Sequence, residues 1–165
     1  MSNILCVYYT RSGKTRQTME QIAGALDAEL VEINDDRPRG GKKGYIRCAM
    51  DAVRKSSRKL LPFQTEKKLE EYDLVILGTP VWAGRCSSVM RSFLKYHGVK
   101  IRRAALVITR STEVRHEEVY LQMDHYLTEK HCYSVSLRPG DAGYDFWLGQ
   151  FVKNICNEFL AEKQE

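Results

Sequence analysis

Short apolar runs alternate along the chain with longer segments in which apolar residues recur at every third or fourth position. Residues 3–9 form the first run, and residues 14–27 form the first periodic segment, with Met19, Ile22 and Leu26 on one face. A short run predicts a buried strand, whereas the periodicity predicts an amphipathic helix. We therefore expect strands at residues 3–9, 29–33, 72–77, 103–109 and 132–137, helices at residues 14–27, 45–60, 87–96 and 117–127, and a last helix capped by Asp141.

This alternation predicts an α/β fold, a doubly wound five-stranded parallel sheet between two helical layers. A glycine-bearing loop follows the first strand, which favours the strand order 2-1-3-4-5. In such a three-layer sandwich the ligand lies beyond the carboxyl ends of the strands, close to strands 1 and 3. Candidate site residues should therefore lie in the loops that follow Tyr9, Leu77 and Thr109.

The length of 165 residues fits one domain, so we expect a single domain over residues 1–165. The five cysteines are scattered and form no Cys-x-x-Cys pair, which argues against a disulfide framework and against a zinc site. Such usage is typical of a reducing compartment, so we expect a cytoplasmic location. The N-terminus lacks the basic region of a signal peptide, and no stretch approaches the ~20 apolar residues that cross a membrane.

Positive charge is concentrated in one insert-like segment, residues 37–68. This segment holds eleven basic and two acidic residues, a charge of +9, while the rest of the chain carries −4. Ile46, Met50, Val53 and Leu60 would share one face of its predicted helix, which leaves the basic side chains exposed. The segment is either a solvated surface or a contact for an anionic membrane surface, an acidic protein or nucleic acid. Because a recognised nucleic-acid motif and an obvious stacking platform are both missing, we expect no nucleic-acid partner.

The loop after the first strand is rich in hydroxyl groups. Residues 10–15 read Thr-Arg-Ser-Gly-Lys-Thr, between a predicted strand and a predicted helix. Three hydroxyls and a run of backbone N–H groups can surround one phosphate here, the helix dipole adds partial positive charge, and Gly13 lets the backbone approach closely. The alternative interpretation is a turn that only caps the helix.

Two other phosphate-handling motifs are incomplete. Residues 13–15 (Gly-Lys-Thr) match the end of the P-loop pattern, but that pattern needs a glycine where this chain has Tyr8. A nucleoside triphosphatase is therefore not expected. A thiol phosphatase needs Cys-x5-Arg, and both Cys6 and Cys86 precede an arginine by one position too few.

Two strand-end loops carry a recognisable pair of motifs, residues 10–15 (Thr-x-Ser-Gly-x-Thr) and residues 78–85 (Gly-Thr-Pro-Val-Trp-Ala-Gly-Arg). Together they resemble the flavodoxin family of FMN-binding proteins, and the order of the elements is similar over nearly the whole chain. The resemblance implies a flavodoxin-like fold with FMN as the cofactor. In that family the first loop holds the FMN phosphate and the second runs along the flavin ring, which makes Trp82 the expected aromatic stack, with ordinary core packing as the alternative.

The third loop, after the fourth strand, departs from the family pattern because it lacks glycines. It reads Thr-Arg-Ser-Thr-Glu over residues 109–113, and Arg110 would lie either at the electron-rich edge of the flavin or in solvent. The cofactor-binding residues that the resemblance implies are Thr10, Arg11, Ser12, Gly13, Lys14, Thr15, Thr79, Pro80, Val81, Trp82, Ala83, Gly84, Thr109, Arg110 and Ser111.

The resemblance implies a redox protein that carries electrons between a donor and a partner protein or small acceptor. Two alternatives stay open: an FMN-dependent quinone or protoporphyrinogen-type oxidoreductase, and an interaction module without flavin. Whether the chain is an enzyme is thus undecided. No side chain is assigned as catalytic or as a metal ligand, and the four histidines are expected to be structural or surface residues. Cys86 is either a small packing residue or a redox-sensitive thiol.

Overall fold

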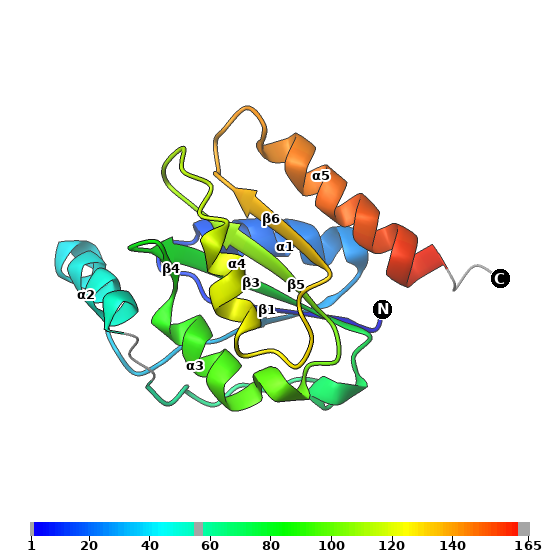
Figure 1. The fold of residues 1–165 in the computed structure, drawn as a ribbon, viewed down its shortest axis with the longest axis horizontal. Helices are drawn as coiled ribbons and strands as arrows, with labels where there is room; N and C mark the ends of the chain where they lie inside the picture. The colour runs from blue at the N-terminus through cyan, green and yellow to red at the C-terminus, as the bar shows by residue number, and fades with distance from the viewer. Residues whose placement is uncertain (1, 55–57, 162–165) are drawn as a thin grey trace.

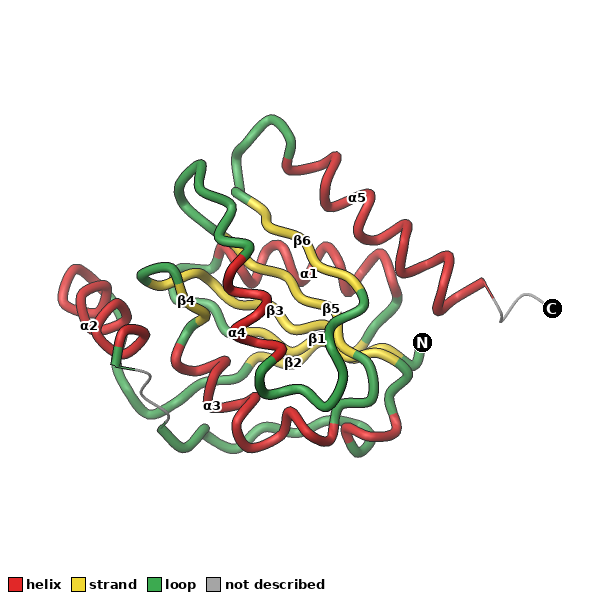
Figure 2. The backbone as a smooth tube through the Cα atoms, viewed as in Figure 1, coloured by secondary structure: helices red, strands yellow, loops and turns green. Residues whose placement is uncertain are grey.

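A parallel sheet forms the middle layer of the molecule, with helices on both of its faces (Figure 1 and Figure 2). The computed structural model describes residues 2–54 and 58–161. The strands are β1 (Ile4–Tyr8), β2 (Glu29–Glu32), β3 (Leu74–Trp82), β4 (Arg85–Cys86), β5 (Ala104–Thr109) and β6 (Tyr133–Leu137). The α-helices are α1 (Lys14–Leu26), α2 (Gly41–Val53), α3 (Ser88–His97), α4 (Glu118–Asp124) and α5 (Tyr144–Ile155), and short helical turns cover Leu69–Glu71, Gly98–Lys100 and Cys156–Leu160.

The strands lie in the order β2-β1-β3-β5-β6, and all of these neighbours are parallel. The two-residue strand β4 lies off this path and pairs with the end of β3 in antiparallel fashion. With β4 set aside, this is the predicted order 2-1-3-4-5, so the predicted doubly wound sandwich is confirmed. All five parallel strands therefore end at the same edge of the sheet.

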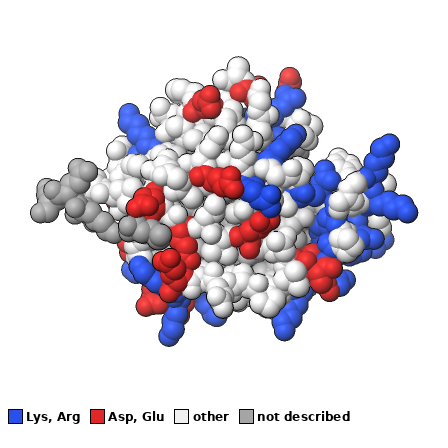
Figure 3. All heavy atoms as spheres, turned by 180° about the vertical axis from the view of Figure 1, so that it is seen from behind, with Lys and Arg blue, Asp and Glu red and all other residues white. Residues whose placement is uncertain are grey.

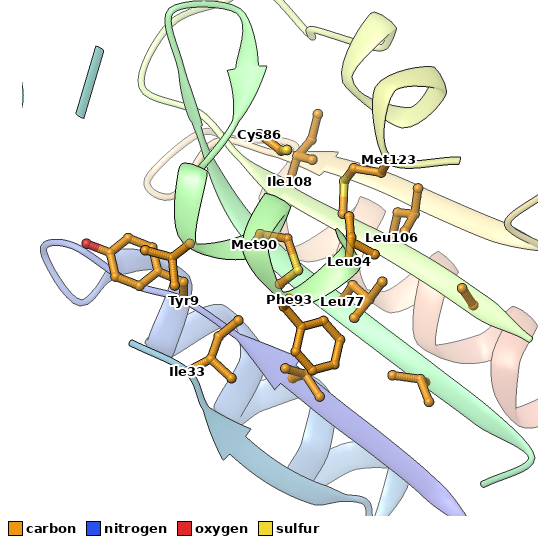
Figure 4. Close-up of a cluster of buried hydrophobic side chains, with 14 of the residues drawn as sticks. Tyr9, Ile33, Leu77, Cys86, Met90, Phe93, Leu94, Leu106, Ile108 and Met123 are labelled. Atoms are coloured by element: carbon orange, nitrogen blue, oxygen red, sulfur yellow. The ribbon is translucent and has the colours of Figure 1, made fainter. Parts of the chain in front are cut away.

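Alternation of side chains along the strands divides the core into two halves. Leu5 and Val7 face the half covered by α3 and α4, while Ile4 and Cys6 face the half covered by α1 and α5. Both faces of the sheet are apolar because helices cover both, as a doubly wound fold requires. The half beneath α3 and α4 is drawn in Figure 4, where Phe93 and Met90 meet the central strands.

Strand β3 extends further than the sequence predicts. The apolar run was expected to end at Leu77, but the strand continues through Pro80 to Trp82 and turns back into β4. Ala83 and Gly84 form the turn, and both have positive φ angles, 50° and 71°. This two-residue turn matches the right-handed twist of the hairpin that it closes. Residues 79–82 therefore belong to a paired strand rather than to a loop.

The last helix begins differently from the prediction. Asp141 was expected to cap it, but the N-cap residue is Gly143 and no side chain caps the helix. The Asp141 backbone carbonyl instead accepts a hydrogen bond from the Tyr144 N–H at 3.1 Å, which closes a turn before the helix starts.

The basic helix α2 is oriented opposite to the prediction. It runs over Gly41–Val53 instead of residues 45–60, and residues 55–57 of the predicted helix lie outside the described residues. Its buried side presents Gly44, Cys48 and Ala52 at intervals of four. Of the apolar residues predicted to share one face, Ile46, Met50 and Val53 point outward, and with Tyr45 they form an exposed apolar face of α2. Leu60 lies beyond the helix and packs against the core.

Close approach of the backbone explains this orientation. A Cβ atom at Gly44 would lie 2.0 Å from the carbonyl oxygen of Arg39, so only glycine fits where α2 contacts the preceding loop. Beneath the helix, the buried Arg39 guanidinium pairs with Asp35 at 2.8 Å and with Asp51 at 3.1 Å. The small residues and the buried ion pairs thus fix the inner face, and the bulky apolar residues are left outside.

Three further findings concern the described residues as a whole. No helix in the described ranges is long and apolar enough to cross a membrane. The five cysteines are free thiols. Within residues 2–54 and 58–161, no three His, Cys, Asp or Glu side chains come together as a metal site would require.

The contact at Gly44 leads to a testable prediction. Replacing Gly44 by alanine should lower the free energy of unfolding by about 1–3 kcal/mol, since the new methyl group meets rigid backbone. Gly24→Ala is the matched control, because Gly24 lies inside α1 with nothing within 4 Å of a Cβ atom. That control should stabilise the protein by about 0.5–1 kcal/mol. Urea denaturation checks both values, and a neutral G44A variant would contradict the close contact.

Candidate functional site

A cleft lies at the edge of the sheet where β1, β3 and β5 end. Its volume is about 120 Å³, below the roughly 300–1,000 Å³ of pockets that enclose a drug-sized ligand. The cleft can therefore hold one part of a larger ligand while the rest lies along the surface. Its lining residues are Arg11, Ser12, Lys14, Thr15, Tyr45, Pro80, Val81, Trp82, Thr109, Arg110, Ser111 and Pro139.

The loop between β1 and α1 offers hydrogen-bond donors to the cleft. Gly13 has a φ of 96° and its N–H donates to the Thr10 hydroxyl at 3.0 Å, which closes the loop. Helix α1 then begins at Lys14 without a side-chain cap. The first N–H groups of a helix have no partners within the helix, and the helix dipole makes this end partially positive. The arrangement favours an anion at the start of α1.

A buried hydrogen bond ties this loop to the neighbouring strand end. The Thr15 and Thr109 hydroxyl oxygens lie 2.8 Å apart, and both side chains are buried. Thr15 is in the first turn of α1, whereas Thr109 is the last residue of β5. The two walls of the cleft are therefore held in a fixed relation to each other.

Trp82 lines the cleft but is largely built into the protein. Only 7% of its surface is exposed, and its ring meets Tyr9 edge to face at a centroid distance of 5.4 Å. The Arg39 guanidinium carbon lies 5.4 Å from the centroid of the Trp82 ring. The structure thus combines both interpretations of the sequence: Trp82 packs in the core and also presents part of its surface to the cleft.

A buried ionic cluster contacts the Trp82 ring through Arg39. Arg39, Asp35 and Asp51 are each at most 4% exposed at the side chain, and Arg39 also donates to the Ser88 hydroxyl at 3.0 Å. Burial also raises the pKa of the nearby Tyr9 hydroxyl. Charges of both signs are thus buried together, and the rigid cluster fixes one side of the Trp82 ring.

Tyr45 is a lining residue that the sequence analysis did not identify. It comes from α2, is 65% exposed, and has the Arg11 guanidinium 5.6 Å from its ring centroid. Pro139, just after β6, was also missed. An aromatic residue at the start of the insert-like segment was the available signal for Tyr45, but nothing local in the sequence indicates that α2 lies beside the strand ends.

Arg110 faces the cleft and is not free in solvent. Its Nε donates to the Ser136 hydroxyl at 2.9 Å, and its Nη1 donates to the Thr112 carbonyl at 2.6 Å. With Arg11 and Lys14 it gives the cleft three cationic side chains, and no carboxylate is among the described lining residues. The electrostatic character of the cleft is therefore positive.

Several of the sequence-derived site residues lie next to the cleft rather than in its lining. Thr79 is fully buried, and its hydroxyl donates to the Ser87 hydroxyl at 2.9 Å and accepts the Ser87 N–H at 3.1 Å, which anchors the start of α3. The predicted site residues outside the lining are Thr10, Gly13, Thr79, Ala83 and Gly84. A cofactor role for these five residues stays a prediction that rests on the family resemblance.

Two cysteines near the motifs are protected thiols. Burial raises the pKa of Cys6 to about 12 and that of Cys86 to about 11, so both remain protonated at neutral pH. The thiolate is the reactive form, and both side chains are at most 1% exposed. Cys86 therefore acts as a packing residue in this structure.

The cleft combines an anion-binding helix end, three cations and two aromatic side chains. The Arg11, Lys14 and Arg110 side chains suit a phosphorylated ligand, while Trp82 and Tyr45 offer apolar surface to a planar group. A ligand with both a phosphate and a planar ring system matches this arrangement.

Three solved structures share the fold of this chain. A flavoprotein of Lactobacillus acidophilus NCFM in complex with FMN has 20% identity and a TM-score of 0.67, covering 89% of this chain and 99% of that chain. Oxidised flavodoxin 2 from Bacillus cereus has 18% identity and a TM-score of 0.57, covering 94% and 99%. A Fusobacterium nucleatum flavodoxin bound to FMN has 13% identity and a TM-score of 0.56, covering 96% and 99%.

A match between the sequence and a family profile assigns the family as well as the fold. The profile of the flavodoxin family matches residues 3–112, a span that includes the loop after β1, the whole β3–β4 hairpin and the first residues after β5. Together with the strand order and the cleft at the strand ends, this match shows that the chain belongs to the flavodoxin family.

Proposed function

We propose that this protein binds FMN in the strand-end cleft and transfers electrons between a donor and a partner protein or small acceptor. The observation that carries the proposal is the start of α1, which lacks a side-chain cap and faces a cleft with three cations. The Lactobacillus flavoprotein and the Fusobacterium flavodoxin, both solved with FMN, support the choice of cofactor.

The phosphate of FMN would be held by the loop between β1 and α1. Ser12 and Lys14 are exposed and line the cleft. The backbone N–H groups at the start of α1 point out of the helix end that the dipole makes partially positive. Hydrogen bonds to an ionised phosphate are stronger than those to a neutral group. The Thr15 hydroxyl, fixed by Thr109, adds a positioned polar group.

The ring system of FMN would lie along the surface between Trp82 and Tyr45. The cleft is too small to enclose a flavin, so an edge of the ring would stay open to a partner. When bound, FMN supplies the electron-accepting and electron-donating chemistry. The chain supplies the anchor for the phosphate, apolar side chains that exclude water, and the positive charge of Arg11, Lys14 and Arg110, which favours a more negative ligand.

A second candidate function is an FMN-dependent oxidoreductase that acts on a lipophilic acceptor, such as a quinone or a porphyrin precursor, at an anionic lipid surface. The exposed apolar face of α2 favours it, because this face includes Tyr45 and so begins at the cleft itself. Lys42, Lys43 and Arg54 flank the face and are exposed. Figure 3 shows Lys and Arg side chains gathered around α2. Apolar residues framed by positive charge suit a membrane surface with anionic headgroups.

The first test compares FMN with riboflavin, which lacks the phosphate. FMN should bind on the order of 100-fold more tightly, since two charge-assisted hydrogen bonds together contribute roughly 3 kcal/mol. Thr15→Val should lower FMN affinity about 10-fold and leave riboflavin affinity unchanged. Fluorescence titration measures each affinity.

A matched control separates this effect from a general loss of stability. Thr18 lies one turn along α1 and bonds to the Tyr144 hydroxyl at 2.7 Å, outside the cleft. Thr18→Val should therefore change stability but not FMN affinity. Equal affinities for FMN and riboflavin would refute the assignment of residues 10–15 as the phosphate site.

Tyr45 allows a test of the ring site. Tyr45→Ala should weaken FMN and riboflavin binding equally, by about 2- to 12-fold, because a lost aromatic contact costs roughly 0.5–1.5 kcal/mol. Stability should change by less than about 0.5 kcal/mol, since the side chain is 65% exposed. Tyr96→Ala is the control, an exposed tyrosine on α3 outside the cleft. A selective loss of FMN binding over riboflavin binding would contradict the stacking role.

Vesicle sedimentation tests the lipid contact of the second candidate. The protein should sediment with vesicles that contain phosphatidylserine and stay in the supernatant with purely zwitterionic vesicles. Each of Lys42→Gln and Lys43→Gln should weaken binding about 5-fold, in line with about 1 kcal/mol for each charge near the surface. The double variant Ile46→Glu/Met50→Glu should abolish it, whereas Leu121→Glu on α4 should not. If the double variant bound vesicles as tightly as the unmodified protein, the apolar face of α2 would be excluded as the contact.

A further inference from the structure

A second cavity lies between β4, α3 and α4 and shares no lining residue with the strand-end cleft. Its volume is about 220 Å³, enough for a small molecule but not for a flavin. We call it the Arg91 cavity. It is lined by Arg85, Cys86, Arg91, Gln122, His125 and Tyr126.

Arg91 brings a poorly compensated positive charge to this cavity. The residue is only 4% exposed. Its Nη2 donates to the Ala52 carbonyl at a long 3.4 Å, and its Nη1 is buried without a hydrogen-bond partner. Among residues 2–54 and 58–161, no carboxylate forms an ion pair with it. A buried charge without an opposite charge is unfavourable, so this arrangement calls for a negative partner.

Arg39 shows how the same fold treats its other buried arginine. Its side chain is also only 4% exposed, but Asp35 and Asp51 lie within 3.1 Å of its guanidinium. Its Nε and Nη1 also lack hydrogen-bond partners, so the two arginines differ in charge balance rather than in hydrogen bonding. Carboxylates of the chain thus neutralise Arg39, whereas Arg91 contacts a carbonyl at the end of α2 and the Cys86 thiol. Because burial keeps that thiol protonated, Cys86 adds no negative charge to the cavity.

Gln122 brings an unused acceptor to the same cavity. Its Nε2 donates to the Gly84 carbonyl at 3.2 Å, which fixes the orientation of the side-chain amide. The other amide atom, Oε1, is then buried without a donor. Two lining residues thus each carry one buried polar atom without a hydrogen-bond partner, a charged donor on Arg91 and a neutral acceptor on Gln122. Arg85 and His125 are further lining groups, and no carboxylate is among the described lining residues.

We propose that the Arg91 cavity binds a small oxyanion that also carries an O–H group. An ionised oxygen would accept a hydrogen bond from Arg91 Nη1, and the O–H would donate to Gln122 Oε1. Hydrogen phosphate and short hydroxycarboxylates share this chemistry, and both are small enough for the cavity. Sulfate and acetate have the charge but lack the O–H at neutral pH. The site is separate from the FMN site and does not depend on it.

NMR titration of the ¹⁵N-labelled protein locates the ligand residue by residue. Phosphate and glycolate are the probes, and sulfate and acetate are the matched anions without an O–H. We expect phosphate or glycolate to shift the Gln122 side-chain amide and the backbone amides of residues 84–91 with one saturable curve. Sulfate and acetate should bind about 10-fold more weakly, because Gln122 then stays unpaired. The tighter of the two probes identifies the source of the anion.

Three variants complete the test. Arg91→Met should remove the shifts around Gln122, raise the thermal midpoint of the anion-free protein, and reduce the rise that phosphate causes to the part that comes from the loop at residues 10–15. Gln122→Met, which keeps Arg91, should bind phosphate and sulfate equally. Arg102→Gln, an exposed arginine outside both the strand-end cleft and the Arg91 cavity, should behave as the unmodified protein.

The titration also separates this site from the loop at residues 10–15, where phosphate is expected to bind as well. Shifts at that loop should persist in Arg91→Met. Absence of saturable shifts around Gln122 at concentrations on the order of tens of millimolar would overturn the proposal, as would equal binding of phosphate and sulfate to the unmodified protein. Shifts around Gln122 that are unchanged in Arg91→Met would overturn it too.

Discussion

Parallel strands must all point in the same direction, and the site of this protein depends on that constraint. Once β1, β3 and β5 pair in register, their carboxyl ends meet at one edge, and loops far apart in the sequence become neighbours. The hydrogen bond between Thr15 and Thr109 is the visible result, because it joins the start of α1 to the end of β5, which are far apart in the sequence. Because the sheet already brings these loops together, the conformation of each loop is enough to place its side chains in a common cleft.

Buried charge is the second organising feature, and the two buried arginines illustrate different solutions. Arg39 is neutralised by Asp35 and Asp51, and this cluster fixes α2 and one side of Trp82. Arg91 has no such carboxylate among the described residues, although it is buried to the same degree. A buried cation that is balanced by carboxylates of the chain contributes rigidity, whereas one without them favours a negative partner from outside the chain.

The sequence was most informative where structure is decided locally. Apolar runs, helical periodicity and the hydroxyl-rich loop at residues 10–15 predict the strand order and the main edge of the cleft. The orientation of α2 was not accessible, because it is decided by the approach of Gly44 to Arg39 and by buried ion pairs across the chain. The extension of β3 through Trp82 likewise depends on pairing with β4. Tyr45 enters the cleft only as a consequence of these long-range contacts.

The cleft's dependence on strand pairing also bears on when the protein can acquire a ligand during its formation. β1 pairs with β3 and β3 with β5 across long intervening segments, and such non-local pairings form slowly. The loops after β1 and β5 adopt their relative positions only once these pairings exist, so the complete cleft is a consequence of the finished sheet. The Thr15–Thr109 hydrogen bond then joins the two walls of the cleft through groups of the chain alone, so the cleft is preformed for its ligand.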